Sequence, residues 1–198
     1  MTSFERLTHQ HAALLIVDLQ GKLLAKIPAR DEVVGNAARL IDGAGLLEIP
    51  VVATEQYPQG LGPSVAAIAD RVAHRLSKTN FHCGEVPELV LLIAERSLRH
   101  ITLAGIEAHI CVAQTALELM RLGLTVQVAA DAVASRHQVD YEFALRRLER
   151  AGVVVSTTEA ILFEWTESSR HPNFKAISAL VKDRGAAANM EVSSQARD

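Results

Sequence analysis

The chain has 198 residues, with 20 Lys and Arg against 23 Asp and Glu and a formal net charge of −3 at pH 7. This length suits one domain with a single hydrophobic core. The nearly balanced charge gives no electrostatic reason to expect nucleic acid or an anionic membrane as a partner, so we expect small molecules or proteins as partners.

No apolar stretch reaches the roughly 18 to 20 residues that span a bilayer, because Asp18 interrupts the first apolar run and Glu95 and Arg96 interrupt another. The first residues show neither the basic start nor the long apolar segment of a secretory signal. The two cysteines, Cys83 and Cys111, have no metal-ligand spacing. We therefore expect a cytoplasmic protein with reduced thiols.

Apolar runs of strand length alternate with helical patterns along the chain. The strand-like runs are continuous in Val, Ile, Leu and Ala, which indicates burial on both faces, as in a parallel sheet. The pattern predicts, in chain order, a strand at 12–18, a helix at 31–49, a strand at 50–56, a loop at 55–64, an extended stretch at 75–81, a helix at 88–100, a strand at 101–107, a helix at 111–123, a strand at 124–133, a helix at 141–152 and a strand in 153–160.

The predicted fold class is α/β, with a doubly wound, mostly parallel sheet and helices on both faces in a Rossmann-like three-layer arrangement. Residues 1–184, ending in a short amphipathic segment at 173–182, are predicted to form one domain, and 185–198 a flexible tail. The loop at 55–64 is rich in Pro and Gly and is interpreted as a functional loop or lid, or else as an ordinary surface loop.

Ligands of open parallel sheets bind beyond the carboxyl ends of the strands. The polar and reactive residues that the pattern places at these ends are Asp18, Glu55, Gln56, Lys78, Cys111 and Asp131.

Cys111 falls at the start of a predicted helix, where unpaired N–H groups and the helix dipole favour an anion such as a thiolate. Such positions lower the pKa of reactive cysteines, so Cys111 is a candidate nucleophile, although a buried packing role is the alternative. Asp18 is a candidate base or a helix cap, and Lys78 a partner cation or a surface lysine. Together, the carboxylate can accept the thiol proton and the ammonium can hold both anions.

Other chemistries lack their sequence motifs. The chain has no G-x-G-x-x-G after a strand, no G-x-x-x-x-G-K-[ST] and no G-x-S-x-G, and Leu117 stands where a cysteine phosphatase has Arg. Hydrolysis by a thiolate is the chemistry that remains.

Four motifs carry a family resemblance. They are "LLIVDLQ" at 14–20, "SKTNF" at 77–81, "GIEAHICVAQTALEL" at 105–119 and "VAADAVASR" at 128–136. In this order they resemble the isochorismatase-like cysteine hydrolases over about residues 12–182. The segments "ATEQYPQGLG" at 53–62 and "HPNFKAISALVK" at 171–182 are most similar to the branch called isochorismatase domain-containing proteins.

The resemblance implies a catalytic triad of Asp18, Lys78 and Cys111. It also implies a cis peptide bond between Ile106 and Glu107, and an oxyanion hole formed by the backbone N–H groups of Glu107 and Cys111. Family members form homo-oligomers, so a dimer or a higher assembly is expected. Residues that could line the substrate pocket by position are Gln56, Tyr57, Phe81, His109 and Gln114.

One departure from the family pattern concerns metal binding. Nicotinamidases in the superfamily carry an Asp-x-His segment after the second strand, where this chain has "TEQYPQG" at 54–60 without a histidine. Glu55 and Gln56 alone make a poor transition-metal site, so we expect no metal and no cofactor, and we do not expect nicotinamide as the substrate.

The leading functional hypothesis is a cysteine hydrolase that cleaves the C–N bond of a small amide through a thioester. The alternative is an oligomeric scaffold or interaction protein that keeps the hydrolase fold with little or no catalysis. A nucleotide-binding module has only the fold in its favour.

Overall fold

Six strands form one sheet in the order β3-β2-β1-β4-β5-β6, and every pair of neighbours is parallel. The structure is a computed structural model that describes residues 6–182, so the tail predicted at 185–198 lies outside the described residues. The strands are β1 (Ala12–Val17), β2 (Val51–Gln56), β3 (Arg75–Lys78), β4 (His100–Ile106), β5 (Thr125–Ala134) and β6 (Val154–Ser156).

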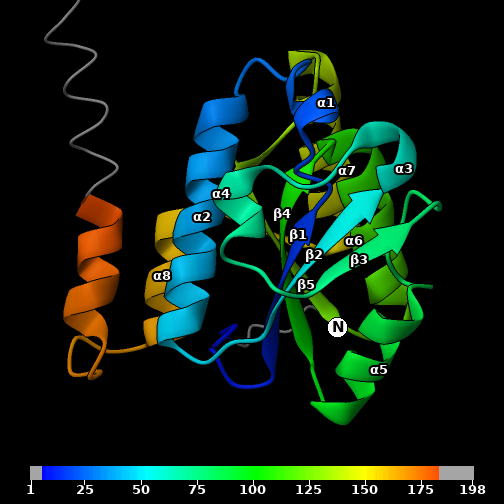
Figure 1. Ribbon diagram of the computed structural model, residues 1–198. Coiled ribbons are helices and arrows are strands. Elements are labelled where there is room, and N and C mark those ends of the chain that lie inside the picture. The colour runs from blue at the N-terminus through cyan, green and yellow to red at the C-terminus, as the bar shows by residue number, and fades with distance from the viewer. Residues whose placement is uncertain (1–5, 183–198) are drawn as a thin grey trace, which may run out of the picture.

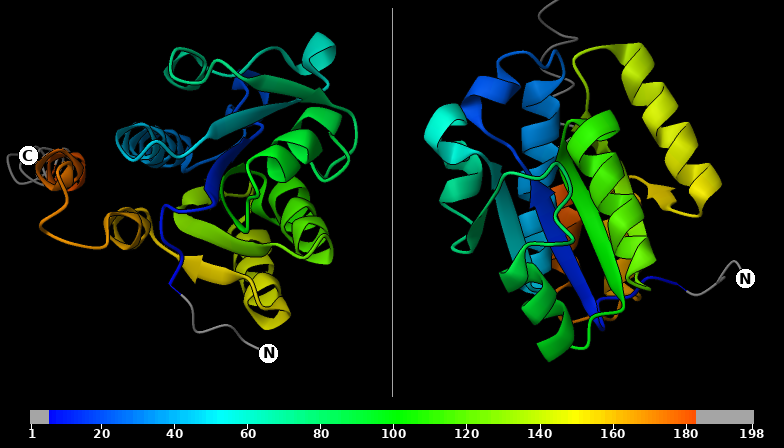
Figure 2. Two further views of the ribbon diagram at one scale, coloured as in Figure 1. Left: turned by 90° about the horizontal axis from the view of Figure 1, so that it is seen from below. Right: turned by 90° about the vertical axis from the view of Figure 1, so that its right-hand side faces the viewer.

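Helices cover both faces of this sheet (Figures 1 and 2). One layer holds α2 (Arg30–Leu46), α4 (Ala66–Ala69), α8 (Thr158–Thr166) and a last helix at 174–182, and the other holds α5 (Pro87–Glu95), α6 (Ala113–Arg121) and α7 (Gln138–Ala151). Short elements at the connections are α1 (Gly21–Leu24), α3 (Pro58–Leu61) and the π-helical turn η1 (Ala108–Val112). The predicted doubly wound α/β class is confirmed.

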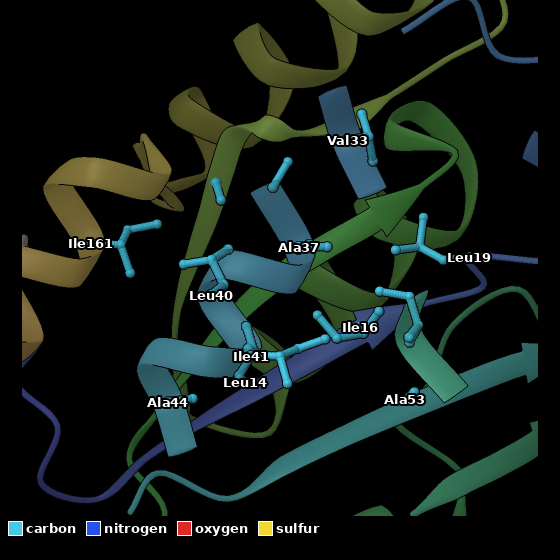
Figure 3. Packing of buried hydrophobic residues seen from close by; sticks show 14 of the residues in the cluster. Leu14, Ile16, Leu19, Val33, Ala37, Leu40, Ile41, Ala44, Ala53 and Ile161 are labelled. Atoms are coloured by element: carbon cyan, nitrogen blue, oxygen red, sulfur yellow. The ribbon is translucent and has the colours of Figure 1, made fainter. Parts of the chain in front are cut away.

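The sheet separates two hydrophobic cores, and β1 contributes to both by strict alternation. Leu14 and Ile16 pack with the α2 side, where Figure 3 shows them beneath Leu40 and Ile41 of α2. Leu15 and its neighbours Ala13 and Val17 pack with the opposite core. Burial on both faces explains why the strand sequences are continuously apolar.

Three local predictions need correction. The strand expected within 153–160 ends at Ser156, because the Thr157 side chain caps α8 by accepting a hydrogen bond from the Ala160 N–H at 3.4 Å. The helix expected at 88–100 ends at Glu95, shortly before Ser97 takes a left-handed conformation with φ 49°. The loop at 55–64 contains the helical turn α3.

The loop at 55–64 is also tied to the end of β1. The Gln20 side chain donates to the Gly62 carbonyl at 2.6 Å and to the Gln56 carbonyl at 3.0 Å, and it accepts from the Gln56 N–H at 2.8 Å. The Glu55 carboxylate accepts from both the N–H and the hydroxyl of Ser64 at 2.9 Å. These bonds fix both ends of the segment.

The chain leaves β1 toward β2 on one side and returns through β4 on the other, so β1 and β4 flank the topological switch point of the sheet. In doubly wound sheets this is where the crevice for a ligand forms. None of the helices within residues 6–182 combines the length and the apolar character needed to cross a membrane.

Candidate active site

Asp18 and Lys78 form a buried ion pair at the carboxyl edge of the sheet. Lys78 Nζ donates to Asp18 Oδ2 at 2.7 Å, and the two side chains are 2% and 0% exposed. The same ammonium donates to Gln56 Oε1 at 2.6 Å and to the carbonyls of Asn80 and Phe81 at 3.3 and 3.2 Å. The buried cation is therefore held by a carboxylate and three neutral oxygens, which offsets much of the cost of removing it from water.

Asp18 leaves β1 in a left-handed conformation, with φ 53°, which non-glycine residues rarely adopt outside constrained sites. Its N–H donates to the Thr54 carbonyl at 3.1 Å, and its Oδ1 accepts from the Thr54 hydroxyl at 2.8 Å. These bonds fix both the backbone and the carboxylate of Asp18, because Thr54 pairs with Val17 in the β1–β2 ladder.

Cys111 reaches the same edge from β4. The Ile106–Glu107 peptide bond is cis, at the place where the family resemblance implies one, and the chain then forms the turn η1. The helix thus begins at Ala108 and not at Cys111 as predicted, which places the thiol one turn inside a continuous helix formed by η1 and α6. The Cys111 side chain is buried, with the residue 7% exposed.

The resting charge state of Cys111 differs from the expectation. Burial, reinforced by the negative charge of Asp18 and a hydrogen bond with it, raises the pKa of the Cys111 thiol to about 12, against an opposing contribution from Lys78. A lowered pKa was expected from the position at a helix start, but desolvation outweighs that effect here. The free thiol is therefore protonated at neutral pH and faces a carboxylate that can accept its proton.

The family resemblance implies an oxyanion hole formed by the backbone N–H groups of Glu107 and Cys111, which lie at the junction of β4 and η1. Glu107 stands between β4 and η1, outside both the strand ladder and the helix. Its carbonyl accepts hydrogen bonds from the N–H groups of Ile110 and Val112, at 3.1 and 3.2 Å, and not from the Cys111 N–H that lies between them in sequence. The π-helical turn thus presents the Cys111 N–H differently from a regular helical turn.

A cavity of about 280 Å³ opens beside Lys78, and of the proposed triad only Lys78 is among the residues that line it. Of the five predicted pocket residues, Tyr57 lines it, together with residues such as Asn80, His82 and Glu85. The Gln56 side chain accepts a hydrogen bond from Lys78 Nζ and donates one to the Thr79 carbonyl at 2.7 Å.

The other three predicted pocket residues do not line this cavity. The Phe81 residue is 53% exposed and gives only its carbonyl to the site. His109 contacts the Ser135 hydroxyl at 2.9 Å through Nδ1, and Gln114 is exposed. Their role in a substrate pocket stays a prediction.

Two polar residues predicted at strand ends serve the fold. Asp131 accepts from both the N–H and the hydroxyl of Thr158, at 2.7 and 2.9 Å, and so holds the start of α8. Glu55 anchors the loop at 55–64, as described above. Cys83 is fully buried, as its predicted core role requires, and its sulfur contacts the Thr115 hydroxyl.

Sequence reasoning missed Thr54, Gln20 and Arg136. Thr54 precedes the two polar residues that were noticed after β2, and the alternation of a strand that places it toward Asp18 could have indicated it. Arg136 ends the "VAADAVASR" motif, and its contact with Glu107 spans 29 positions. Within residues 6–182, no three His, Cys, Asp or Glu side chains gather closely enough to hold a metal ion.

Comparisons with known proteins agree with this fold. The model of the isochorismatase domain matches residues 12–160. The chain is 39% identical over 181 residues to isochorismatase domain-containing protein 2 of Danio rerio, covering 91% of this chain and 92% of that protein. Among solved structures, the MAR1 ribonuclease of Caenorhabditis elegans superposes with a TM-score of 0.85 at 37% identity, covering 89% of this chain and 92% of that one.

The YcaC protein of Escherichia coli, described as an octameric hydrolase of unknown specificity, has a TM-score of 0.86 at 23% identity over the whole of both chains. The three-layer fold is thus that of the isochorismatase-like hydrolases, which supports a hydrolase role. This chain belongs to the isochorismatase family.

Proposed function

We propose that this protein is a cysteine hydrolase that cleaves the C–N bond of a small amide through a thioester intermediate. The observation that carries the proposal is the convergence of a carboxylate, an ammonium and a thiol at the switch point of the sheet. Asp18 is bonded to Lys78 at 2.7 Å, and its charge and hydrogen bonding both act on Cys111. A nucleophile, a base and a group that orients the base are the parts that covalent catalysis requires.

The raised pKa of Cys111 determines how the first step proceeds. With a pKa raised to about 12, the Cys111 thiol is protonated at pH 7, so a standing thiolate is not the attacking species. Asp18 instead accepts the thiol proton as Sγ bonds to the amide carbonyl carbon. Lys78 stabilises the negative charge that passes between the carboxylate and the sulfur, and the N–H groups of Glu107 and Cys111 bind the oxyanion.

The later steps return the protein to its starting state. Asp18, now protonated, gives its proton to the amide nitrogen as the C–N bond breaks, which releases the amine and leaves a thioester on Cys111. A water molecule then attacks the thioester carbon while Asp18 accepts a proton from that water. Collapse of the second tetrahedral intermediate releases the carboxylic acid, and Cys111 Sγ takes the proton back from Asp18.

The cavity beside Lys78 leaves room for part of a small substrate next to the proposed triad. A volume of about 280 Å³ lies just below the usual range of roughly 300 to 1,000 Å³ for ligand pockets. Lys78 and Glu85 place charges of both signs on its walls. An uncharged or weakly charged amide fits this lining better than a multiply charged substrate.

A panel of small amides, followed by release of ammonia or amine, tests the proposal. We expect wild-type protein to turn over at least one amide, Cys111→Ala to be inactive, and the matched cysteine variant Cys83→Ala to keep activity. Intact mass spectrometry of the Asp18→Asn variant with the same substrate should show no acyl adduct, whereas acid-quenched wild type should show one. Turnover that survives in Cys111→Ala contradicts the mechanism.

The same variants also distinguish the proposed hydrolase from two alternative functions, a scaffold and a ribonuclease. A scaffold predicts that wild type and Cys111→Ala are equally inactive toward every amide while they assemble alike. The ribonuclease description of the Caenorhabditis elegans relative makes RNA a necessary second substrate in the assay. RNA cleavage by wild type that persists in Cys111→Ala would replace our proposal. Homo-oligomer formation stays a prediction.

A further inference from the structure

Two residues that follow β5 bind the segment that leads from the end of β4 into η1. Ile106 pairs with Ala134 in the β4–β5 ladder, so the next residues of the two strands, Glu107 and Ser135, leave the sheet side by side. The nucleophile loop, defined here as residues 107–111, therefore runs along the loop that starts at Ser135. This arrangement brings distant parts of the sequence together beside Cys111.

Arg136 binds the first residue of the nucleophile loop. Its N–H donates to Glu107 Oε2 at 3.0 Å, and its Nε lies 3.1 Å from the same oxygen and 3.0 Å from Oε1. The Glu107 side chain is 11% exposed, whereas that of Arg136 is 50% exposed. A mostly buried carboxylate with a backbone and a guanidinium donor is well fixed, even though the arginine itself reaches solvent.

Ser135 binds the middle of the same loop. Its hydroxyl contacts His109 Nδ1 at 2.9 Å, and Asp140 lies 3.9 Å from the other ring nitrogen of His109. Ser135 is itself buried. Thus two of the four residues that lead from β4 to Cys111 are bound by two consecutive residues of one other segment.

We infer that Arg136, assisted by Ser135, is a positioning residue that holds the Glu107 N–H in the oxyanion hole. The inference rests on the proposed function, because it assigns a task to the donor named there. Arg136 has a second effect, since the Glu107 carboxylate belongs to the same residue as the donor and its negative charge would oppose an oxyanion. The guanidinium balances that charge while it fixes the side chain.

Kinetic variants test this assignment. In Arg136→Ala we expect kcat to fall by about tenfold to a hundredfold with KM nearly unchanged, which is less than the roughly 10² to 10³ lost when an oxyanion donor is removed outright. Arg136→Lys, which keeps the charge without the planar fork, should recover part of the loss. Glu107→Gln placed in the Arg136→Ala background should also recover activity, because it removes the unbalanced charge. A purely structural arginine would show neither recovery.

Arg71→Ala is the matched control, because Arg71 also binds a carboxylate, that of Asp42 at 3.0 Å, and lies between α4 and β3 away from the site. It should keep wild-type kcat. If Arg136→Ala keeps kcat within about twofold of wild type, or if Arg71→Ala loses as much, the inference is wrong. Should Arg136→Ala not fold, Arg136→Lys and Ser135→Ala give the same comparison.

Hydrogen exchange separates this inference from the proposed function. The N–H groups of Ile110 and Val112 bond to the Glu107 carbonyl, so they report on the loop without any substrate. We expect their exchange to be at least about tenfold faster in Arg136→Ala than in Arg71→Ala. If wild type hydrolyses no amide, the proposed function fails, but unchanged exchange alone would still overturn the positioning role, and faster exchange would support it.

Discussion

Thr54 and Asp18 bind each other twice across the β1–β2 pair. The Asp18 N–H donates to the Thr54 carbonyl at 3.1 Å, and the Thr54 hydroxyl returns a bond to Asp18 Oδ1 at 2.8 Å. Because Lys78 occupies the other carboxylate oxygen, Thr54 is what fixes the rotation of the proposed base. The orientation of Asp18 toward Cys111 thus depends on a residue that has no reactive group of its own.

Replacing Thr54 by Val should therefore affect both stability and turnover. The change keeps the shape but leaves a buried carboxylate oxygen without its donor, which costs about 1 to 3 kcal/mol of unfolding free energy. We expect kcat to fall as well, since the base loses its fixed orientation. Urea unfolding and amide turnover measure the two effects. Thr54→Ser, which keeps a hydroxyl, is the control, and a Val variant as active as the Ser variant would contradict the role.

The Asp18–Lys78 pair should behave as a buried ion pair in a double-mutant cycle. Lys78→Met removes one partner and leaves the other charge buried, which costs about 3 to 5 kcal/mol. Adding Asp18→Asn should restore part of this stability, because no unpaired charge then remains, yet it should not restore activity. The exposed Arg121–Glu118 pair is the comparison, and Arg121→Ala should change the unfolding free energy far less than Lys78→Met does. Additive effects of Lys78→Met and Asp18→Asn in urea titrations would show that the two groups do not act as a pair.

Much of the fold could be predicted because burial leaves a simple signal. Strands such as β1 are apolar at every position, since one face packs on α2 and the other on the opposite core. The helix α8 was missed because it directly follows a valine-rich run that is typical of a strand. Threonine is also common in strands, so Thr157 gave no indication that it caps a helix. A local sequence pattern can thus predict that a strand is present without predicting the residue at which it ends.

The site also has a part that the sequence indicates and a part that only the fold reveals. Asp18, Lys78 and Cys111 were indicated by motifs and by their places at strand ends, and the structure brings them together. The contacts of Thr54 with Asp18 and of Arg136 with Glu107 span 36 and 29 positions, so no local pattern could reveal them. The pKa of Cys111 was misjudged for the same reason, because burial depends on the whole fold.

The raised pKa of Cys111 gives a pH dependence of stability with a definite sign. Below about pH 9 the thiol is protonated in both the folded and the unfolded chain, so it contributes nothing. Between about pH 9 and 12 the unfolded chain ionises while the folded chain holds its proton, so the unfolding free energy falls as the pH rises. The loss should be on the order of 1 kcal/mol at pH 10.

Comparison of wild type with Cys111→Ser isolates this contribution, because all other titrating groups are common to both proteins. Urea unfolding between pH 8 and pH 10.5 should show the wild type losing stability relative to the serine variant. A difference that stays constant over this range would mean that the thiol titrates normally in the folded protein, and the base-assisted first step would then lose its support.

Gly105 sets how closely β4 approaches β1 just before the site, and its replacement should be the most damaging single change in this region. It has φ 129°, and a Cβ at this position would overlap the backbone of Val17, the residue before Asp18. Gly123 separates the two causes, because it has φ 87° but open space around its added Cβ. Gly123→Ala should cost about 1 to 2 kcal/mol from backbone strain alone. Gly105→Ala should cost clearly more in urea unfolding and should also lower turnover, since Val17 cannot move without displacing Asp18. An equal loss of unfolding free energy in the two variants would mean that β4 can shift to make room for the added Cβ and does not fix the end of β1.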